Sequence, residues 1–297
     1  MTDSRPLDDE MMKTESITDF IIDGKKVELL NEKWDVLVIL DACRYDKFKK
    51  LYDGKNKDNL KKAISPACHT REFLEKIFTK KYDDIIYIST NPFINSYGIK
   101  LSNKQKFNPK NKFKKIVDLW NLVWDDDLGT VHPKKVNFVA KEYLEKSDNR
   151  LIIHYMQPHF PYIFYGGFKR TGSNKKKNKM KRRILDKTIE ITKKIIGQKG
   201  FWKIGGVFGQ LPKGGQGWIW FNYGTKGIIK GYEEDLKLVI GYVKKLINDF
   251  PDKNFLIIAD HGERLGEHNR FFHEGRRDKE VIEVPWLEIY GKKEESG

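Results

Sequence analysis

The chain has 297 residues, of which 39% are hydrophobic and 33% charged, and its 57 lysines and arginines against 42 acidic residues give a formal net charge of +15. This composition excludes an intrinsically disordered chain, which buries too little apolar surface to offset its chain entropy. Only two cysteines are present, Cys43 and Cys68, which excludes a small disulfide-stapled scaffold. The length suits one large α/β domain.

The amino-terminal residues are polar and lack the apolar core of a secretory signal, and no apolar run approaches the roughly 20 residues that a membrane-spanning helix needs. We therefore expect a cytoplasmic protein whose two cysteines are reduced thiols. Residues 1–30 are expected to be a polar lead-in with one short amphipathic stretch. Residues 31–297 are expected to form a single catalytic domain.

Short apolar runs alternate with amphipathic segments along the chain. The runs predict buried strands over residues 34–40, 82–89, 151–156, 255–259 and 284–290, and the amphipathic segments predict helices over 70–78, 134–146 and 232–250. Strands that are apolar on both faces need covering helices on each side. The predicted fold class is therefore α/β, with a doubly wound, mostly parallel sheet and helices on both faces.

One long segment, about residues 166–230, breaks this alternation and is expected to form an insertion or lid. Its first part, residues 169–183, holds nine basic residues and no acidic one, and its second part is rich in glycine and aromatic residues. The basic part suits contact with an anionic glycan or a membrane surface, although a solvated loop is an equally simple interpretation. No nucleic-acid-binding motif accompanies it, so no nucleic-acid partner is expected.

Polar side chains stand where the predicted strands end. Asp41 and Asn91 follow the first two strands, His154 and His159 lie at and beyond the end of the third, and Asp260-His261 follow the fourth. Ligands of open α/β sheets bind at this carboxyl edge. Carboxylates combined with imidazole favour Zn or Mn over the harder ions Ca and Mg, which stay possible. Trp124 and the acidic run at 125–127 are typical of a packed helix end.

Three motifs occur in the order found in one enzyme superfamily. They are an early strand ending in Asp41 with Arg44 close behind, the element His154-Tyr-Met-Gln-Pro-His159-Phe-Pro-Tyr162, and Asp260-His-Gly-Glu-Arg-Leu-Gly-Glu-His268 followed by His273 and Val284-Pro285. With them the sequence resembles the sulfatase-like branch of the alkaline phosphatase superfamily over residues 34–290.

The resemblance implies a divalent metal held by Asp41, Asp260 and His261, with His273 as ligand of a second metal if there is one. It also implies that His159 faces an anionic phosphate- or sulfate-ester substrate, with His154 as a second candidate. An imidazole there can protonate the leaving group. Asn91 and Arg44 are candidate substrate contacts, with an ordinary turn and a surface helix as the alternative interpretations.

The nucleophile is left open among three residues. The superfamily places it at the N-terminus of a helix, where backbone N–H groups also hold the anion, and the stretch Ser65-Pro-Ala-Cys-His-Thr-Arg-Glu-Phe enters the helix predicted from residue 70. Cys68 departs from the sulfatase pattern in the position of its arginine. Ser65 fits the alignment with phosphotransfer relatives about as well, and Thr70 comes third because it is also a good N-cap.

The favoured function is a metal-dependent hydrolase of phosphate or sulfate esters, with phosphate preferred, acting through a side-chain nucleophile at a helix N-terminus. The first alternative is a transferase that passes a phospho-alcohol group to a glycan or lipid acceptor. The second is an inactive, sulfatase-like protein that binds anionic partners. Substrate, metal count and oligomeric state are left open by the sequence.

Overall fold

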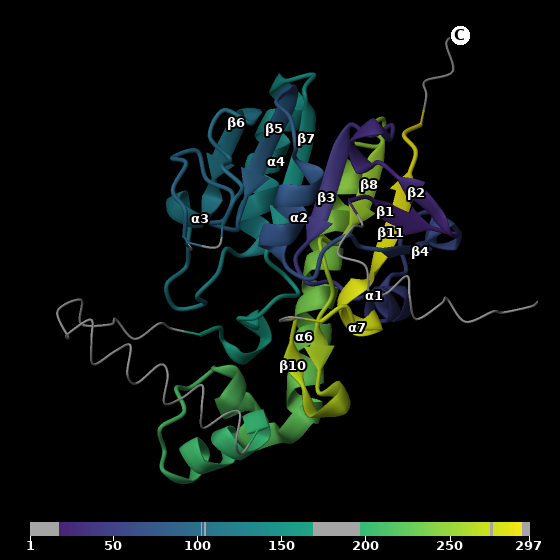
Figure 1. Ribbon diagram of the computed structural model, residues 1–297. Helices are drawn as coiled ribbons and strands as arrows, with labels where there is room; N and C mark the ends of the chain where they lie inside the picture. The colour runs from purple at the N-terminus through teal and green to yellow at the C-terminus, as the bar shows by residue number, and fades with distance from the viewer. Residues whose placement is uncertain (1–17, 102, 104, 169–196, 274–275, 293–297) are drawn as a thin grey trace, which may run out of the picture.

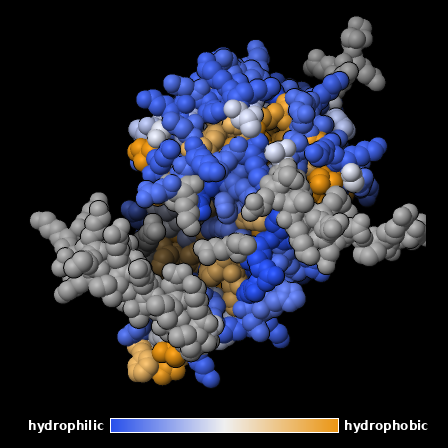
Figure 2. Space-filling model, viewed as in Figure 1, coloured by the Kyte–Doolittle hydropathy of each residue, from blue (hydrophilic) through white to orange (hydrophobic). Residues whose placement is uncertain are grey.

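The computed structural model describes residues 18–101, 103, 105–168, 197–273 and 276–292. The predicted basic segment 169–183 lies outside the described residues. Among the described residues, no helix is both long and apolar enough to cross a membrane. The face seen in Figure 2 is mostly hydrophilic.

A nine-stranded sheet forms the centre of the molecule, in the order β2-β1-β4-β11-β8-β3-β7-β5-β6. The strands are β1 (Phe20–Ile22), β2 (Lys25–Val27), β3 (Val36–Leu40), β4 (Lys61–Ile64), β5 (Tyr82–Ser89), β6 (Phe113–Asp118), β7 (Arg150–Tyr155), β8 (Phe255–Ile258) and β11 (Glu283–Ile289). Neighbours from β8 to β6 pair in parallel. Neighbours from β2 to β8 pair antiparallel. The sheet is therefore mixed, and its parallel centre confirms the predicted α/β fold class.

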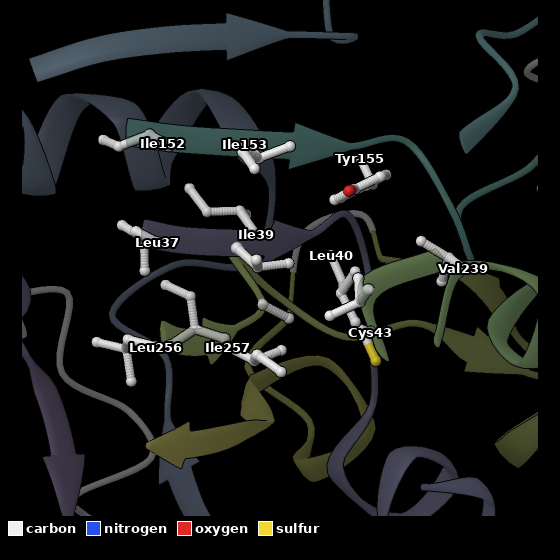
Figure 3. Close-up of a cluster of buried hydrophobic side chains, with 14 of the residues drawn as sticks. Leu37, Ile39, Leu40, Cys43, Ile152, Ile153, Tyr155, Val239, Leu256 and Ile257 are labelled. Carbon is white, nitrogen blue, oxygen red and sulfur yellow. The ribbon is translucent and has the colours of Figure 1, made fainter. Parts of the chain in front are cut away.

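The central strands are apolar on both faces because both faces are covered. All five residues of β3 are buried, and its Leu37 pairs in register with Ile152 of β7 and Leu256 of β8. Figure 3 shows these side chains packed together, with Val239 of the long helix α6 beside Tyr155. Burial of such side chains contributes about 1.5–3 kcal/mol each, so this layer fixes the position of the strand ends that carry the site.

Helices cover the two faces of the sheet (Figure 1). They are α1 (Tyr45–Leu51), α2 (Thr70–Ile77), α3 (Leu119–Leu122), α4 (Pro133–Lys146), α6 (Gln216–Asp249) and α7 (Lys279–Ile282). On one face, Tyr155 of β7 donates a hydrogen bond to Asn137 of α4 (2.6 Å), and α6 packs on the same side. On the other face, Phe78 at the end of α2 packs edge-on against Tyr87 of β5, with ring centroids 5.9 Å apart.

The sequence patterns did not predict four of the strands, β1, β2, β4 and β6. Two of them, β1 and β2, lie in the stretch expected to be a polar lead-in, so its later part belongs to the sheet. Phe20 of β1 is fully buried and packs against Phe73 and Trp286, with centroids 6.2 and 5.4 Å away. The strands β1, β2 and β4 have only three or four residues each, too few for a period-two pattern to be distinguished from a loop.

The described part of the predicted insertion is helical rather than irregular. Residues 197–207 are helical, and α6 begins at Gln216, well before the predicted start at 232. Gly224 interrupts α6 with a φ of 65° and a ψ of −165°, a conformation that only glycine adopts without strain. The chain on either side of Gly224 therefore runs in different directions, and the first part of α6 leaves the body of the molecule (Figure 1).

Two short strands and a 3-10 turn lie beside the site. The strands β9 (Arg264–Leu265) and β10 (Phe271–Phe272) form a small antiparallel pair. They connect the Asp260-His261 turn to His273. A 3-10 helix, Ile163–Tyr165, follows β7 and is tied to α6 by the carboxylate of Asp235, which accepts hydrogen bonds from the backbone N–H groups of Ile163 and Phe164.

Candidate metal and phosphate-ester site

The residues predicted at the strand ends lie together at the carboxyl edge of the parallel sheet. Asp41 follows β3, Asn91 follows β5, and Asp260-His261 follow β8. All four side chains are buried. The N-terminus of α2 points at the same place and brings Thr70, its first residue, to the group.

Each of the two carboxylates has one oxygen bonded and one without a partner. Asp41 Oδ2 accepts a hydrogen bond from the Asn91 amide (2.8 Å). Asp260 Oδ1 accepts the backbone N–H groups of Ala42 (3.1 Å) and His261 (2.9 Å). The other oxygens, Asp41 Oδ1 and Asp260 Oδ2, are buried without a hydrogen-bond partner, and an unpaired buried acceptor of this kind is costly.

The imidazole of His261 faces these two free oxygens. Its Nδ1 is 2.9 Å from the carbonyl oxygen of Gly262, which can only accept, so Nδ1 carries the proton. Burial and the nearby His273 lower the pKa of His261, which keeps the ring neutral. The lone pair of Nε2 is then directed at Asp260 Oδ2 (3.4 Å) and Asp41 Oδ1 (3.6 Å). The lone pairs of these three atoms repel one another, and a cation between them would remove the repulsion.

The donor set fits a divalent metal ion. Two carboxylate oxygens and a neutral imidazole nitrogen converge with Thr70 Oγ1, which lies 3.4 Å from His261 Nε2. One nitrogen among oxygen donors suits Zn or Mn. Burial and the adjacent charge of Asp41 raise the pKa of Asp260 to about 7. The pKa of Asp41 is shifted up by burial and, more strongly, down by the imidazoles of His159, His154 and His261, so that it stays below its usual range.

Of the three predicted nucleophiles, the structure brings one to the site. Thr70 lines the cavity next to Asp41. The Ser65 hydroxyl is fully buried and donates to the backbone carbonyl of Asp260 (2.5 Å) while accepting from Ala67 N–H (3.1 Å). It fastens the end of β4 to the end of β8.

Cys68 also faces away from the cavity. It packs against Val281 and Ile282, and burial raises the pKa of its thiol. Its backbone N–H donates to Glu72 (2.8 Å) at the start of α2, and the Glu72 N–H donates to the N-cap His69 (3.1 Å). The order of preference among the predicted nucleophiles is thus reversed by geometry, with Thr70 the best placed.

A second group of possible metal ligands lies beside the first. His159, Glu263 and His273 each offer an atom within 4.8 Å of the others, and His273 Nδ1 is 3.2 Å from Glu263 Oε1. Burial lowers the pKa of His273, but Glu263 outweighs that effect and the pKa rises to about 9. The rings of His261 and His273 are 4.3 Å apart, so the two groups are contiguous. Glu263 was not predicted from the sequence, although it stands inside the Asp-His-Gly-Glu motif.

The three predicted substrate contacts differ in their placement. Asn91 lines the cavity, yet its amide N–H₂ holds Asp41 and its carbonyl accepts from Phe93 N–H (3.0 Å), so it positions a carboxylate. His154 is fully buried behind Asp41, with Nε2 3.6 Å from Asp41 Oδ2 and Nδ1 2.9 Å from the Tyr87 hydroxyl. It does not line the cavity.

Arg44 is likewise away from the cavity. Its guanidinium pairs with Asp46 (2.9 Å) and Glu267 (2.5 Å) and donates to the carbonyl of Glu263. These partners raise its already high pKa further. Arg44 therefore holds the loop that follows β8 against the loop that follows β3. The sequence had suggested that Arg44 contacts the substrate, and its position in the structure does not fit that role.

A cavity of about 1050 Å³ opens above Thr70 and Asp41. Its walls carry the polar residues His69, Arg71 and Asp126, none of which the sequence predicted to be at the site, and the apolar residues Phe93, Trp124, Met156, Phe160 and Phe168. Trp124 and Asp126 were predicted to belong to a packed helix end, but the loop after α3 turns them into the cavity. His159 and His273 also line it, which places two imidazoles next to Thr70.

No known protein family and no curated protein matches the chain by sequence. Solved structures do match. The C-terminal periplasmic domain of EcEptC from Escherichia coli, in complex with Zn, is 13% identical, with a TM-score of 0.51 over 92% of this chain and 76% of that chain. The integral membrane lipooligosaccharide phosphoethanolamine transferase A (EptA) from Neisseria meningitidis is 12% identical, with a TM-score of 0.52 over 86% of this chain. This chain spans about half of that protein, 47% of its length.

A protein of the alkaline phosphatase superfamily from Vibrio parahaemolyticus also aligns, at 12% identity and a TM-score of 0.43, over 86% of this chain and 60% of that chain. At these identities the likeness concerns the fold. The chain shares its mixed α/β fold with the two structures whose TM-scores exceed 0.5, and this agrees with the fold class predicted from its sequence.

Proposed function

We propose that this protein is a metal-dependent phospho-alcohol transferase that opens a phosphate ester through Thr70 and passes the group to a hydroxyl or amine acceptor. The observation that carries the proposal is the position of Thr70 Oγ1, 3.4 Å from His261 Nε2 and beside two buried carboxylates with unpaired oxygens. In that position a hydroxyl shares a cation with Asp41, Asp260 and His261. Neither Ser65 nor Cys68 has such neighbours.

A divalent ion bound by these residues supplies positive charge that lowers the pKa of the Thr70 hydroxyl and offsets charge on the phosphoryl oxygens. The chain adds to this charge. The N-terminus of α2, the positive end of the helix dipole, lies at Thr70 and favours an anion there, and Arg71 lines the cavity next to it. A phosphate group is thus oriented with its phosphorus above Thr70 Oγ1.

The chemistry then needs two displacements at phosphorus. In the first, the Thr70 hydroxyl loses its proton to water, its Oγ1 bonds to phosphorus, and the bond from phosphorus to the donor's ester oxygen breaks. That oxygen leaves with the proton of a cavity imidazole, and a phosphothreonine diester results. In the second, an acceptor hydroxyl or amine gives its proton to that imidazole and bonds to phosphorus, the bond from phosphorus to Thr70 Oγ1 breaks, and Oγ1 takes back a proton from water. His159 and His273 line the cavity at this place, and either can hold the proton.

Transfer is favoured here over the hydrolysis that the sequence suggested first. The Neisseria meningitidis structure, with a TM-score of 0.52, carries the name of a phosphoethanolamine transferase. The apolar part of the cavity wall also suits a bulky organic group better than a small hydrated ester. A sulfate ester is disfavoured because Cys68, the residue that a sulfatase would convert, is directed away from the cavity. Hydrolysis remains the same chemistry with water as acceptor.

The test asks whether the phosphoryl group is bound covalently to Thr70 during the reaction. Protein loaded with Zn or Mn is mixed with a p-nitrophenyl phosphodiester, and p-nitrophenol release is measured alongside the intact mass of the protein. We expect release of p-nitrophenol and a covalent adduct on the tryptic peptide that contains Thr70. Thr70→Ala should lose both by at least about 10³-fold, the scale of removing a nucleophile, and Thr70→Ser should retain part of the rate.

Cys68→Ser serves as the matched control, since it alters a nucleophilic side chain two positions away and should leave the rate unchanged. An adduct on Cys68, or undiminished turnover in Thr70→Ala, would refute the assignment. Acceptor dependence separates the two reactions. A transferase shows faster p-nitrophenol release and a phosphorylated product when glycan or lipid hydroxyl acceptors are added, whereas a hydrolase shows neither.

A further inference from the structure

A helical arm extends from the body of the molecule beside the site. It consists of residues 197–223, namely the helical stretch 197–207, a turn, and the first part of α6 up to Tyr223 (Figure 1). Two residues of the arm, Trp202 and Ile219, are buried and belong to the hydrophobic core of the molecule. A Cβ on Gly206 would come within 2.1 Å of Phe221, and one on Gly217 within 2.6 Å of Trp202. Glycine therefore lets the two helices pack closely.

Large apolar side chains remain exposed on this arm although its interior is filled. The exposed fractions are Ile204 50%, Val207 69%, Phe208 71%, Phe221 41% and Tyr223 53%. Figure 2 shows apolar residues gathered at the lower tip of the molecule, where Figure 1 places the arm. Scattered exposed apolar residues are normal, but such a concentration on one projecting element marks an interaction surface.

The charge of the arm indicates what it contacts. The arm, residues 197–223, contains three lysines, Lys199, Lys203 and Lys213, and no aspartate or glutamate. Two more, Lys226 and Lys230, follow it in α6. Apolar and aromatic side chains interspersed with lysine are the composition of helices that lie in the interface of an anionic membrane. Association with a second copy of the same arm would bring the two sets of lysines together, and their repulsion opposes it.

The arm is joined to the strand pair that carries His273. Trp202 packs on Phe271 with ring centroids 4.9 Å apart, and Lys199 donates to the side chain of Asn269 (2.7 Å). Phe271 is two residues before His273, which lines the cavity. The arm and the cavity therefore lie on the same side of the sheet, at its carboxyl edge (Figure 1).

We propose that the arm, residues 197–223, docks the protein on an anionic lipid surface, with Val207 and Phe208 inserted among the lipids and the lysines among the headgroups. Docking by this element holds the cavity next to the bilayer surface. The proposal concerns binding and stands independently of the reaction at Thr70.

Vesicle co-sedimentation tests this directly. The full chain is mixed with vesicles of phosphatidylcholine alone or of phosphatidylcholine and phosphatidylglycerol in equal parts, and the bound fraction is measured. We expect binding to the anionic vesicles that weakens with salt. The double variant Val207→Ser/Phe208→Ser should reduce the partition coefficient by about tenfold or more, since two apolar side chains no longer leave water.

A control variant separates this effect from a general loss of surface apolarity. Phe138→Ser/Tyr290→Ser changes two aromatic residues that are 69% and 60% exposed and lie away from the arm, and it should bind like the wild type. Two triple variants test the contribution of the lysine charges. Lys203→Glu/Lys213→Glu/Lys226→Glu should abolish anionic binding, while Lys81→Glu/Lys114→Glu/Lys146→Glu, at the opposite edge of the sheet, should lower it far less.

Each variant is first checked for an unchanged thermal midpoint, so that loss of binding is not loss of fold. The proposal is overturned if the wild type does not bind the anionic vesicles, or if Val207→Ser/Phe208→Ser binds them as the wild type does. It is also overturned if sedimentation velocity shows a dimer that this same variant dissociates, because the arm would then be covered by a second copy.

Discussion

At the scale of single residues, the site depends on which oxygen of each carboxylate is already bonded. The Asn91 amide binds one oxygen of Asp41, and two backbone N–H groups bind one oxygen of Asp260. The other oxygen of each carboxylate is left facing His261. The backbone carbonyl of Gly262 accepts a hydrogen bond from Nδ1, which carries the single N–H proton of the neutral His261 ring. These short-range bonds orient a set of lone pairs toward a single point, so a cation site arises from hydrogen bonds made on its far side.

A buried carboxylate outside the site gives a pH prediction. Burial raises the pKa of Asp235 to about 7 against two opposing backbone hydrogen bonds, whereas the unfolded value is 3.8. Between these values the folded chain holds more protons than the unfolded one, so its stability falls as the pH rises from about 4 to 7. Each unit corresponds to about 1.4 kcal/mol, and solvent relaxation reduces the total to about 1–3 kcal/mol.

The check is a comparison with Asp235→Asn by denaturant unfolding at several pH values. The free energy of unfolding of the wild type, taken relative to this variant, should decrease over that range. The exposed Asp252→Asn variant should run parallel to the wild type. A difference between wild type and Asp235→Asn that does not change with pH contradicts the prediction.

At the scale of elements, α6 combines a helix that builds the core with a segment that leaves it. Its later part buries Leu236, Val239 and Ile240 against the sheet, while the part before Gly224 belongs to the arm. The break needs a backbone conformation that is open to glycine alone, and nothing lies within 4 Å of the position where a Cβ would be. A larger residue at position 224 is therefore disfavoured by the backbone conformation and not by a clash with neighbouring atoms.

Two glycines of α6 predict opposite effects of the same substitution. Gly224→Ala should destabilise the protein by about 1–3 kcal/mol because alanine is strained at that φ and ψ. Gly241→Ala, in regular helix and equally open space, should stabilise it by about 0.5–1 kcal/mol through its higher helix propensity. Thermal unfolding of both variants measures this. Equal changes at the two positions would show that Gly224 is not held in the strained conformation.

At the scale of the whole molecule, the metal site joins the ends of β3 and β8 to α2. Removing the cation leaves buried carboxylates with unpaired oxygens at the centre of that junction, so metal and fold should be coupled. We expect EDTA treatment to lower the thermal midpoint by roughly 5 to 10 °C relative to protein saturated with Zn or Mn, as for a ligand at about one hundred times its Kd.

The variant His261→Ala should show no response of the thermal midpoint to EDTA. The variant Asp235→Asn, which replaces a buried carboxylate outside the junction, should respond to EDTA as the wild type does. Differential scanning fluorimetry of the three proteins with and without added Zn or Mn provides the measurement. If neither EDTA nor added metal changes the thermal midpoint of the wild type, the assignment of the metal site is wrong.

The sequence by itself determined the central strands and the residues at their ends. The runs that became β3, β5, β7, β8 and β11 are mostly apolar, and Asp41, Asn91 and Asp260 stand within two residues of the ends of β3, β5 and β8. The pattern of apolar residues and the residues that follow it in the chain were therefore enough to predict both. Short strands and the early start of α6 were missed because lysine and glycine interrupt the periodicity there. The alternation of strands and helices was also enough to predict the α/β class.

Only the tertiary structure decided which side chains face the cavity. Ser65, Cys68 and Thr70 lie within six residues of one another, yet Ser65 is held by the carbonyl of Asp260, 195 positions away, and Cys68 by Val281 and Ile282. Contacts that distant leave no trace in local sequence. The same reason applies to Trp124 and Glu263. Residue chemistry and spacing name the candidates, but their directions are set by packing between segments that meet only when the sheet is complete.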